Sequence, residues 1–161
     1  MLKNGESGVV LFLFCYLFIK SNKKLAIDFD GTIVEDAYPK IGKPNIFAFE
    51  TLKKLQSEGY RLILWTYRSG KYLEEAVEFC RKNGVEFYAV NSSFEGEIFD
   101  GETQSRKIDA DLFIDDRNLG GFPGWGEVYN IISEKIEFRV EGKEVLAYSK
   151  LKRSKKRGWF W

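Results

Sequence analysis

The sequence predicts an α/β protein, a Rossmann-like three-layer sandwich around a mainly parallel central sheet. From Lys24 onward, short apolar runs alternate with longer segments whose apolar residues recur at helical spacing. This alternation of strand and helix argues for parallel strand pairing, with helices on the faces of the sheet. Polar residues follow directly at the ends of several apolar runs, where open α/β sheets bind their ligands.

The first two strand–helix cycles are expected in the first half of the chain. A short apolar strand, Leu25–Ile27, comes first, and a helix of about a dozen residues follows Pro44. Gly59 is expected to end this helix, since glycine readily takes the left-handed conformation at a helix end. A second strand, residues 61–65, precedes a second helix that Gly84 closes. The apolar stripes of these helices are Phe49, Leu52 and Leu55, and Leu73, Ala76, Val77 and Cys80.

Later segments predict two more strands, a short helix and a hairpin. Strands are expected at Val85–Val90 and at Leu112–Ile114, with a polar loop between them. A short helix is expected around Val128–Ile132. Alternating apolar residues in 136–140 and 145–147, separated by a Glu-Gly-Lys turn, predict a C-terminal β-hairpin at an antiparallel edge of the sheet.

The chain of 161 residues is long enough for one domain with a substantial core. Residues 23–149 are expected to form this domain, with an apolar leader at 1–22 and a basic aromatic tail at 150–161. The apolar run Val9–Ile19 is too short to cross a bilayer comfortably, which takes about 20 residues. Three interpretations of this run stay open: a membrane-proximal anchor, an extra packed element, or translated sequence upstream of the true start.

Composition excludes several classes of protein and of catalytic site. The net charge of +1 provides no general attraction to nucleic acid or to a membrane surface. The absence of histidine removes Ser-His-Asp and Cys-His nucleophile systems and most zinc sites. Cys15 and Cys80 make no disulfide framework, so we expect a cytoplasmic protein, or a membrane-associated one if residues 9–19 are an anchor. The basic tail is most simply a solvated segment, with contact to an anionic surface as the alternative.

Oxygen-bearing side chains follow three of the predicted strands. Asp28, Thr66 and Asp115 each come just after the carboxyl end of an apolar run. Asp30 and Asp116 add two more carboxylates, and such a cluster cannot stay fully ionised without a cation. Magnesium suits the cluster because it prefers oxygen ligands and is often completed by substrate phosphate. The pattern therefore predicts Mg²⁺ and a phosphorylated substrate.

These residues include the groups that phosphoryl transfer needs. An aspartate such as Asp28 can attack phosphorus and form an aspartyl-phosphate. Thr66 can donate a hydrogen bond to the phosphoryl oxygens, and Lys107 can supply positive charge. Asp30 is placed to protonate the leaving group and then to activate water.

The same residues resemble the four motifs of the haloacid dehalogenase (HAD) superfamily phosphatases, in the family's order and over residues 24–125. The motifs are Asp28-Phe29-Asp30-Gly31-Thr32, Thr66 after Leu-Ile-Leu-Trp, Lys107, and Asp115-Asp116 after Leu-Phe-Ile. The run Phe-Ile-Asp-Asp-Arg-Asn and the following Gly-Trp-Gly are similar to small bacterial members of the family. The gaps between the motifs leave no room for a separate cap domain, which implies an open, capless site.

The resemblance implies a role for each matching residue. Asp28 would be the nucleophile, and Asp30 would be the acid/base and would also bind the metal through its backbone carbonyl. Thr66 would bind the phosphoryl group, and Lys107 would stabilise the nucleophile and the intermediate. The metal ligands would be Asp28, Asp30 and Asp115, with Asp116 in support.

The main prediction is therefore a magnesium-dependent phosphatase that hydrolyses a phosphomonoester through an aspartyl-phosphate. Two alternatives stay open: a phosphate- or partner-binding module without activity on the same fold, and phosphoryl transfer to an acceptor other than water. Lys107 lies only eight positions before Asp115, so Arg106 is an alternative for its role. Arg68 and Arg117 directly follow site residues and are candidates for substrate binding.

Overall fold

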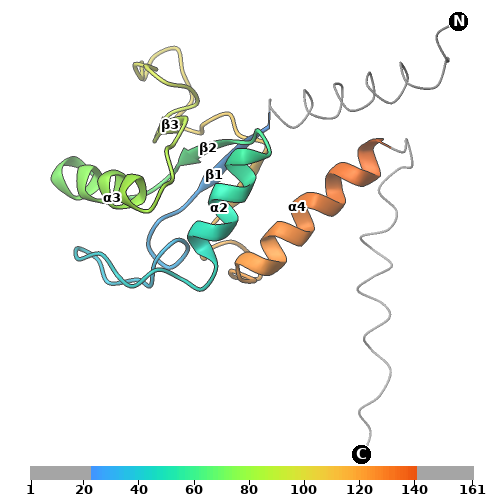
Figure 1. Cartoon of the computed structure of the whole chain (residues 1–161). Coiled ribbons are helices and arrows are strands. Elements are labelled where there is room, and N and C mark those ends of the chain that lie inside the picture. The colour runs from blue at the N-terminus through green and yellow to red at the C-terminus, as the bar shows by residue number, and fades with distance from the viewer. Residues whose placement is uncertain (1–22, 141–161) are drawn as a thin grey trace, which may run out of the picture. The chain divides into compact units, whose positions relative to one another are not determined.

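A four-stranded, all-parallel sheet lies at the centre of the computed structural model, which describes residues 23–140 (Figure 1). Its strands, in the spatial order β3-β2-β1-β4, are β1 (Lys24–Ile27), β2 (Arg61–Leu64), β3 (Ala89–Val90) and β4 (Leu112–Ile114). The helices are α2 (Ala48–Ser57), α3 (Gly70–Lys82) and α4 (Trp125–Val140). The predicted α/β fold with a mainly parallel sheet is confirmed.

The described residues fall into two compact units. Residues up to Tyr129 form the first unit, and residues from Asn130 belong to the second. The long connections between β1 and α2 and between β3 and β4 are both part of the first unit. No helix among the described residues is long and apolar enough to cross a membrane. The apolar run Val9–Ile19 and the tail 150–161 lie outside the described residues.

The strand register gives the sheet two apolar faces, because successive side chains of a strand point to opposite sides. Ala26 pairs with Ile63, and both belong to a buried cluster with Ala89 of β3. Ile108 completes this cluster, so part of one face is covered by the connection between β3 and β4 rather than by a helix. The buried strand residues of the opposite face are Leu25, Ile27, Leu62, Leu64 and Ile114.

The helices α2 and α3 pack together through aromatic rings close to the end of β1. The ring of Phe79 in α3 lies 5.9 Å from that of Phe49 in α2, centre to centre. The same ring lies 6.4 Å from that of Phe29, which follows β1. The predicted apolar stripes include the buried helix residues Leu52, Leu55, Ala76 and Cys80. This packing sets the position of the segment that carries Asp28 and Asp30.

A loop between β1 and α2 is closed at its base by backbone hydrogen bonds. The N–H of Glu35 donates to the carbonyl of Lys43 at 2.8 Å, and that of Asn45 donates to the carbonyl of Ile33 at 2.9 Å. Any side chain at Gly42 would overlap the carbonyl of Glu35, so this close crossing requires glycine. We call the tip of this loop, residues 36–40, the 36–40 loop. Because the base takes up residues to 45, the helix predicted after Pro44 begins only at Ala48.

The third strand is shorter than predicted. The N–H of Val85 donates to the carbonyl of Cys80 at 3.0 Å, so the chain is still closing the end of α3 at that point. The backbone reaches β2 at Tyr88, whose N–H donates to the carbonyl of Leu62 at 2.7 Å. Only Ala89–Val90 then pair as a strand.

The predicted C-terminal hairpin is wrong in its first arm, because residues 136–140 are the end of α4. Val128, Ile132, Ile136 and Val140 recur every four residues, which suits a helix as well as local alternation suits a strand. The helix predicted around Val128–Ile132 therefore runs on through the first arm. The second arm, residues 145–147, lies outside the described residues.

Candidate active site

Three carboxylates meet at the carboxyl edge of the sheet. The strands β1 and β4 are neighbours in register, so Asp28 lies beside Asp115 and Asp116. The backbone N–H of Asp28 donates to the carbonyl of Ile114 at 2.9 Å, which ties the two strand ends together. One carboxylate oxygen from each aspartate lies within 4.8 Å of the others, a grouping that can hold a metal ion. We call Asp28, Asp115 and Asp116 the carboxylate cluster.

The electrostatics of the carboxylate cluster favour a cation. Burial raises the pKa of Asp28 from 3.8 to about 7, and the charges of Asp115 and Asp116 also raise it. Hydrogen bonds from the Phe29 backbone and the Thr32 hydroxyl act in the opposite direction. In Asp116, Oδ1 is buried without a hydrogen-bond partner among the described residues. A hard divalent cation would favour the ionised carboxylates and would satisfy this oxygen, so the residues fit such an ion.

Thr32 connects the two ends of the carboxylate cluster, a role that was not predicted from the sequence. It is fully buried, and its hydroxyl donates to Oδ2 of Asp28 at 3.0 Å. The hydroxyl oxygen of Thr32 in turn accepts the backbone N–H of Asp116 at 3.0 Å. The carbonyl of Thr32 accepts the indole N–H of Trp125 at 3.0 Å and the side-chain amide of Asn45 at 2.9 Å. This network fixes the orientation of the Asp28 carboxylate.

Gly31 allows Asp116 to approach the segment after β1. Its φ of +86° lies in the left-handed region that favours glycine. A Cβ atom at this position would overlap the carboxylate of Asp116. Glycine is therefore required both for the turn and for the closeness of the two strand ends.

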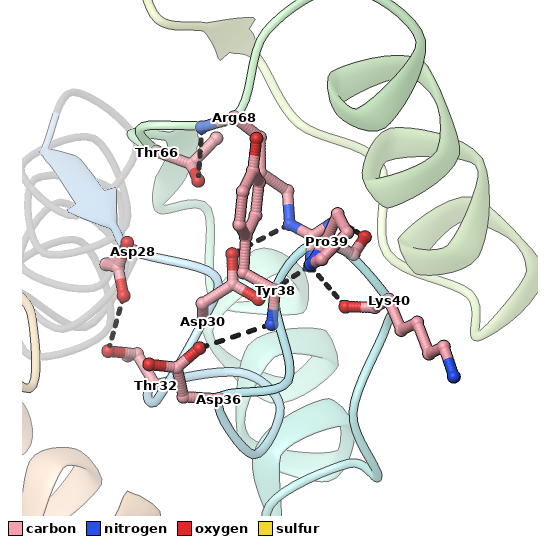
Figure 2. Close-up of polar contacts among 9 residues, drawn as sticks. All are labelled: Asp28, Asp30, Thr32, Asp36, Tyr38, Pro39, Lys40, Thr66 and Arg68. Carbon is pink, nitrogen blue, oxygen red and sulfur yellow. Dashed lines mark hydrogen bonds and ion pairs between the residues drawn. The ribbon is translucent and has the colours of Figure 1, made fainter.

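Arg68 is buried beside the cavity and holds Asp30 in place (Figure 2). Its Nε and Nη2 donate to the two carboxylate oxygens of Asp30, both at 2.7 Å. Its Nη1 donates to the carbonyl of Pro39 at 3.0 Å, and Nη2 also donates to the carbonyl of Lys40 at 2.7 Å. Four of the five N–H groups of a guanidinium are thus committed to protein acceptors. Most hydrogen-bond donors of Arg68 are therefore already used, and few are left for the substrate contact that the sequence suggested.

Thr66 follows β2 and lies at the cavity with its hydroxyl hydrogen available. Its backbone N–H donates to the side-chain carbonyl of Asn91 at 2.8 Å, and Asn91 itself follows β3. Its hydroxyl oxygen accepts the backbone N–H of Arg68 at 3.3 Å (Figure 2). Because this contact uses the oxygen as an acceptor, the hydroxyl can still donate to a ligand.

A cavity of about 660 Å³ lies over these groups. Tyr67 at its rim is 94% exposed and Tyr38 is 51% exposed, so the cavity has aromatic walls open to solvent. Among the predicted site residues, those that line it are Asp28, Asp30, Thr66, Arg68, Asp115 and Arg117. The lining residues that were not predicted are Asp36, Tyr38, Trp65 and Tyr67. Asp116 joins the site through the carboxylate cluster.

The structure does not bring Lys107 into the lining of this cavity. Its side chain is exposed on the connection between β3 and β4, and its backbone N–H donates to the hydroxyl of Ser105 at 3.1 Å. Arg106 is exposed as well, with its guanidinium 5.0 Å from the ring centre of Phe99. Neither candidate for the third motif therefore lines the cavity that holds Asp28.

The residues that sequence reasoning missed differ in how visible they were. Thr32 lies within the first motif, and a hydroxyl four positions after the expected nucleophile is a signal that could have suggested its role. Tyr38 carries no such signal, because only the folding back of the loop between β1 and α2 brings it to the cavity. Trp65 and Tyr67 flank Thr66, so their place beside the cavity follows from that of Thr66.

Comparison with known proteins identifies a relative of known structure. No protein-family model matches the chain, and no curated protein matches it. A solved structure described as that of a conserved protein from Bacteroides thetaiotaomicron is similar, with 56% sequence identity and a TM-score of 0.66. The similarity covers 70% of this chain and 90% of that one. With this identity over this share of the relative, the chain belongs to the family of the conserved Bacteroides thetaiotaomicron protein.

Proposed function

We propose that the protein is a magnesium-dependent phosphatase that hydrolyses a phosphomonoester through an aspartyl-phosphate on Asp28. The observation that carries the proposal is the convergence of Asp28, Asp115 and Asp116 at the edge of a cavity that Thr66 also lines. The raised pKa of Asp28 supports it, because the carboxylate would need a cation to ionise fully at neutral pH.

In this proposal the chain is a capless member of the HAD superfamily with a three-layer, Rossmann-like sandwich. The order of the motif residues along the chain and the parallel sheet support the assignment. The substrate would be a phosphorylated compound, small or large, because the cavity is open at its aromatic rim. A cytoplasmic location and the absence of a nucleic-acid partner belong to the same proposal.

The residues that would hold Mg²⁺ are the carboxylate cluster and the backbone carbonyl of Asp30. Their oxygen atoms match the preference of this ion, and Oδ1 of Asp116, which has no hydrogen-bond partner within residues 23–140, would be free to bind it. When bound, the ion would offset the negative charge of the carboxylates and of the phosphoryl group. Arg117 lines the same cavity, and its exposed side chain is a candidate contact for the substrate.

The proposed reaction has two steps. In the first, a carboxylate oxygen of Asp28 forms a bond to phosphorus while the bond from phosphorus to the ester oxygen breaks, and Asp30 gives that oxygen a proton. In the second, a water oxygen bonds to phosphorus while Asp30 takes a proton from the water, and the Asp28–phosphorus bond breaks. Throughout, the Thr66 hydroxyl donates to a phosphoryl oxygen.

The proposal is tested by phosphate release from an aryl phosphate, measured with and without Mg²⁺. Wild-type protein should release phosphate only with the metal, and Asp28→Asn should lose activity by at least about 10³-fold because the nucleophile is gone. Asp36→Asn changes a carboxylate that lines the cavity but lies outside the carboxylate cluster, so it is the matched control and should keep most activity. Equal rates for wild type and Asp28→Asn would rule the mechanism out.

A second pair of variants tests the third motif. The resemblance assigns the stabilising cation to Lys107, so Lys107→Ala should lower turnover by about 10²-fold or more while Arg106→Ala should not. Both side chains are exposed on the same connection, which makes the two variants a fair comparison for folding. The opposite order of losses would assign the role to Arg106.

A further inference from the structure

We propose that Arg68 is a positioning residue, which fixes the carboxylate of Asp30 and the 36–40 loop together as one wall of the cavity. This inference rests on the proposed function, in which Asp30 transfers protons, and it gives a role to a residue outside the four motifs.

The contact between Arg68 and Asp30 restrains the plane of the carboxylate. Two parallel N–H···O bonds of 2.7 Å join the guanidinium fork to both oxygens of Asp30. The Arg68 side chain is fully buried in the pair, whereas 13% of the Asp30 side chain is exposed. Each oxygen of Asp30 keeps a second lone pair, and Asp30 still lines the cavity. The carboxylate is therefore held in one orientation without being removed from the place where a substrate would bind.

The same guanidinium joins the 36–40 loop to the segment after β1. It donates hydrogen bonds to two backbone carbonyls of the loop, those of Pro39 and Lys40. Its central carbon lies 4.9 Å from the ring centre of Phe29 and 5.3 Å from that of Tyr38. These are distances at which a cation is attracted to the face of an aromatic ring. Arg68 thus bridges the segment after β1, the segment after β2 and the loop (Figure 2).

Within the part of the chain that the structure describes, the 36–40 loop has few other contacts that could hold its position. Its residues are exposed, and its backbone reaches into solvent beyond the base at Glu35 and Lys43. The ring of Tyr38 also meets that of Tyr72 in α3, with 5.8 Å between the ring centres. In the capless site of the proposed function, this loop is the wall that carries Tyr38 and Asp36 to the cavity. Its geometry therefore depends on the bonds from Arg68.

Only arginine can make this set of contacts at position 68. A lysine ammonium offers three donors at one point, and it cannot reach both carboxylate oxygens and both carbonyls in one plane. A purely structural role would make every substrate suffer equally from the change. A positioning role for Asp30 instead predicts a loss that depends on how much the leaving group needs a proton.

The experiment compares Arg68→Lys with wild type on two esters, p-nitrophenyl phosphate and a simple alkyl phosphate, by kcat/KM. The alkoxide must be protonated as it leaves, and p-nitrophenolate need not be. We expect kcat/KM for the alkyl ester to fall by about 10²-fold, the usual size of a general-acid contribution, and that for the aryl ester to fall only a few-fold. In an Asp30→Asn background, Arg68→Lys should cause no further selective loss on the alkyl ester. Arg81→Lys, which alters an exposed arginine paired with Glu78 on α3, is the control and should change neither value.

The outcomes separate this inference from the proposed function. If wild type hydrolyses both esters and Arg68→Lys lowers both equally, the positioning role is overturned and the phosphatase stands. If wild type hydrolyses neither ester, the phosphatase fails. Hydrogen exchange at the hydrogen-bonded amides of Glu35, at the base of the loop, and Tyr38, within it, then decides whether Arg68 holds the 36–40 loop. Faster exchange in Arg68→Lys than in Arg81→Lys would then support it, and equal exchange would overturn it.

Discussion

In the absence of metal, the free energy of unfolding should fall as the pH rises from about 4 to about 7, and Asp28→Asn should remove most of this fall. Folding raises the pKa of Asp28 from 3.8 to about 7, mainly because the side chain is partly buried. Between these two values the unfolded chain has lost the proton of Asp28 and the folded chain still holds it. The folded state therefore binds more protons, and stability decreases with rising pH until Asp28 is ionised in both states.

The size of the effect follows from the distance between the two pKa values. At about 1.4 kcal/mol for each pH unit, the change from 3.8 to about 7 sets a ceiling of about 4 kcal/mol. Asp28 is only half-buried, so solvent screens part of this, and we expect about 2 kcal/mol. Asparagine keeps a carbonyl that can accept the Thr32 hydroxyl, and it has no charge to lose. Without metal at pH 8, Asp28→Asn should therefore be more stable than wild type by about 2 kcal/mol.

Urea unfolding in EDTA at pH 4 and pH 8, followed by tryptophan fluorescence, measures this difference. The two proteins should be nearly equal at pH 4 and differ at pH 8. Saturating Mg²⁺ at pH 8 should reverse the order, because an ion at 100 times its dissociation constant adds about 2.7 kcal/mol to the protein that binds it. Glu102→Gln changes an exposed carboxyl and should show the pH dependence of wild type. If wild type and Asp28→Asn had the same pH dependence, burial of Asp28 would not be the cause of the fall in stability.

Three further changes test the connections around the carboxylate cluster. Gly31→Ala should lower the free energy of unfolding by about 1–2 kcal/mol, because the backbone at this position is left-handed. Its Mg²⁺ affinity in a calorimetric titration should also fall, because the new Cβ overlaps Asp116. Thr32→Val removes the hydroxyl between Asp28 and the Asp116 N–H, and it should cost about 1–3 kcal/mol in urea unfolding and lower kcat rather than raise KM. Trp125→Phe keeps a buried ring but loses the N–H bonded to Thr32, so it should lower the free energy of unfolding by about 1 kcal/mol in thermal unfolding, with Mg²⁺ binding unchanged.

Local patterns were a good guide to the sheet and a poor guide to its surroundings. The strands β1, β2 and β4 lie where apolar runs predicted them, because a buried parallel strand needs a continuous apolar segment. The length of the strand at Ala89–Val90 was overestimated, because nothing in the sequence indicates that Val85 still hydrogen-bonds to the end of α3. The hairpin prediction failed because residues 136–140 satisfy a spacing of two and a spacing of four at once.

The candidate site shows the same division. Asp28, Thr66 and Asp115 line one cavity because each follows a parallel strand, and parallel strands end at the same edge of a sheet. Arg68 also follows such a strand and lines the same cavity, but the sequence did not indicate its bonds to Asp30 and to the 36–40 loop. Lys107 lies on a long connection that no strand positions, and the structure leaves it outside the cavity lining.

The sequence alone placed the chemistry of the carboxyl edge: it shows which aspartates follow the strands, and it predicts that their charges lie close enough together to attract a cation. Strand ends are encoded by neighbouring residues, so a local pattern is sufficient to place them. The folded chain, and not the sequence pattern, shows that Arg68 binds Asp30 and the 36–40 loop, and that Thr32 bridges Asp28 and Asp116. Those contacts join segments that lie far apart in the sequence, so they depend on how the connections fold back across the sheet.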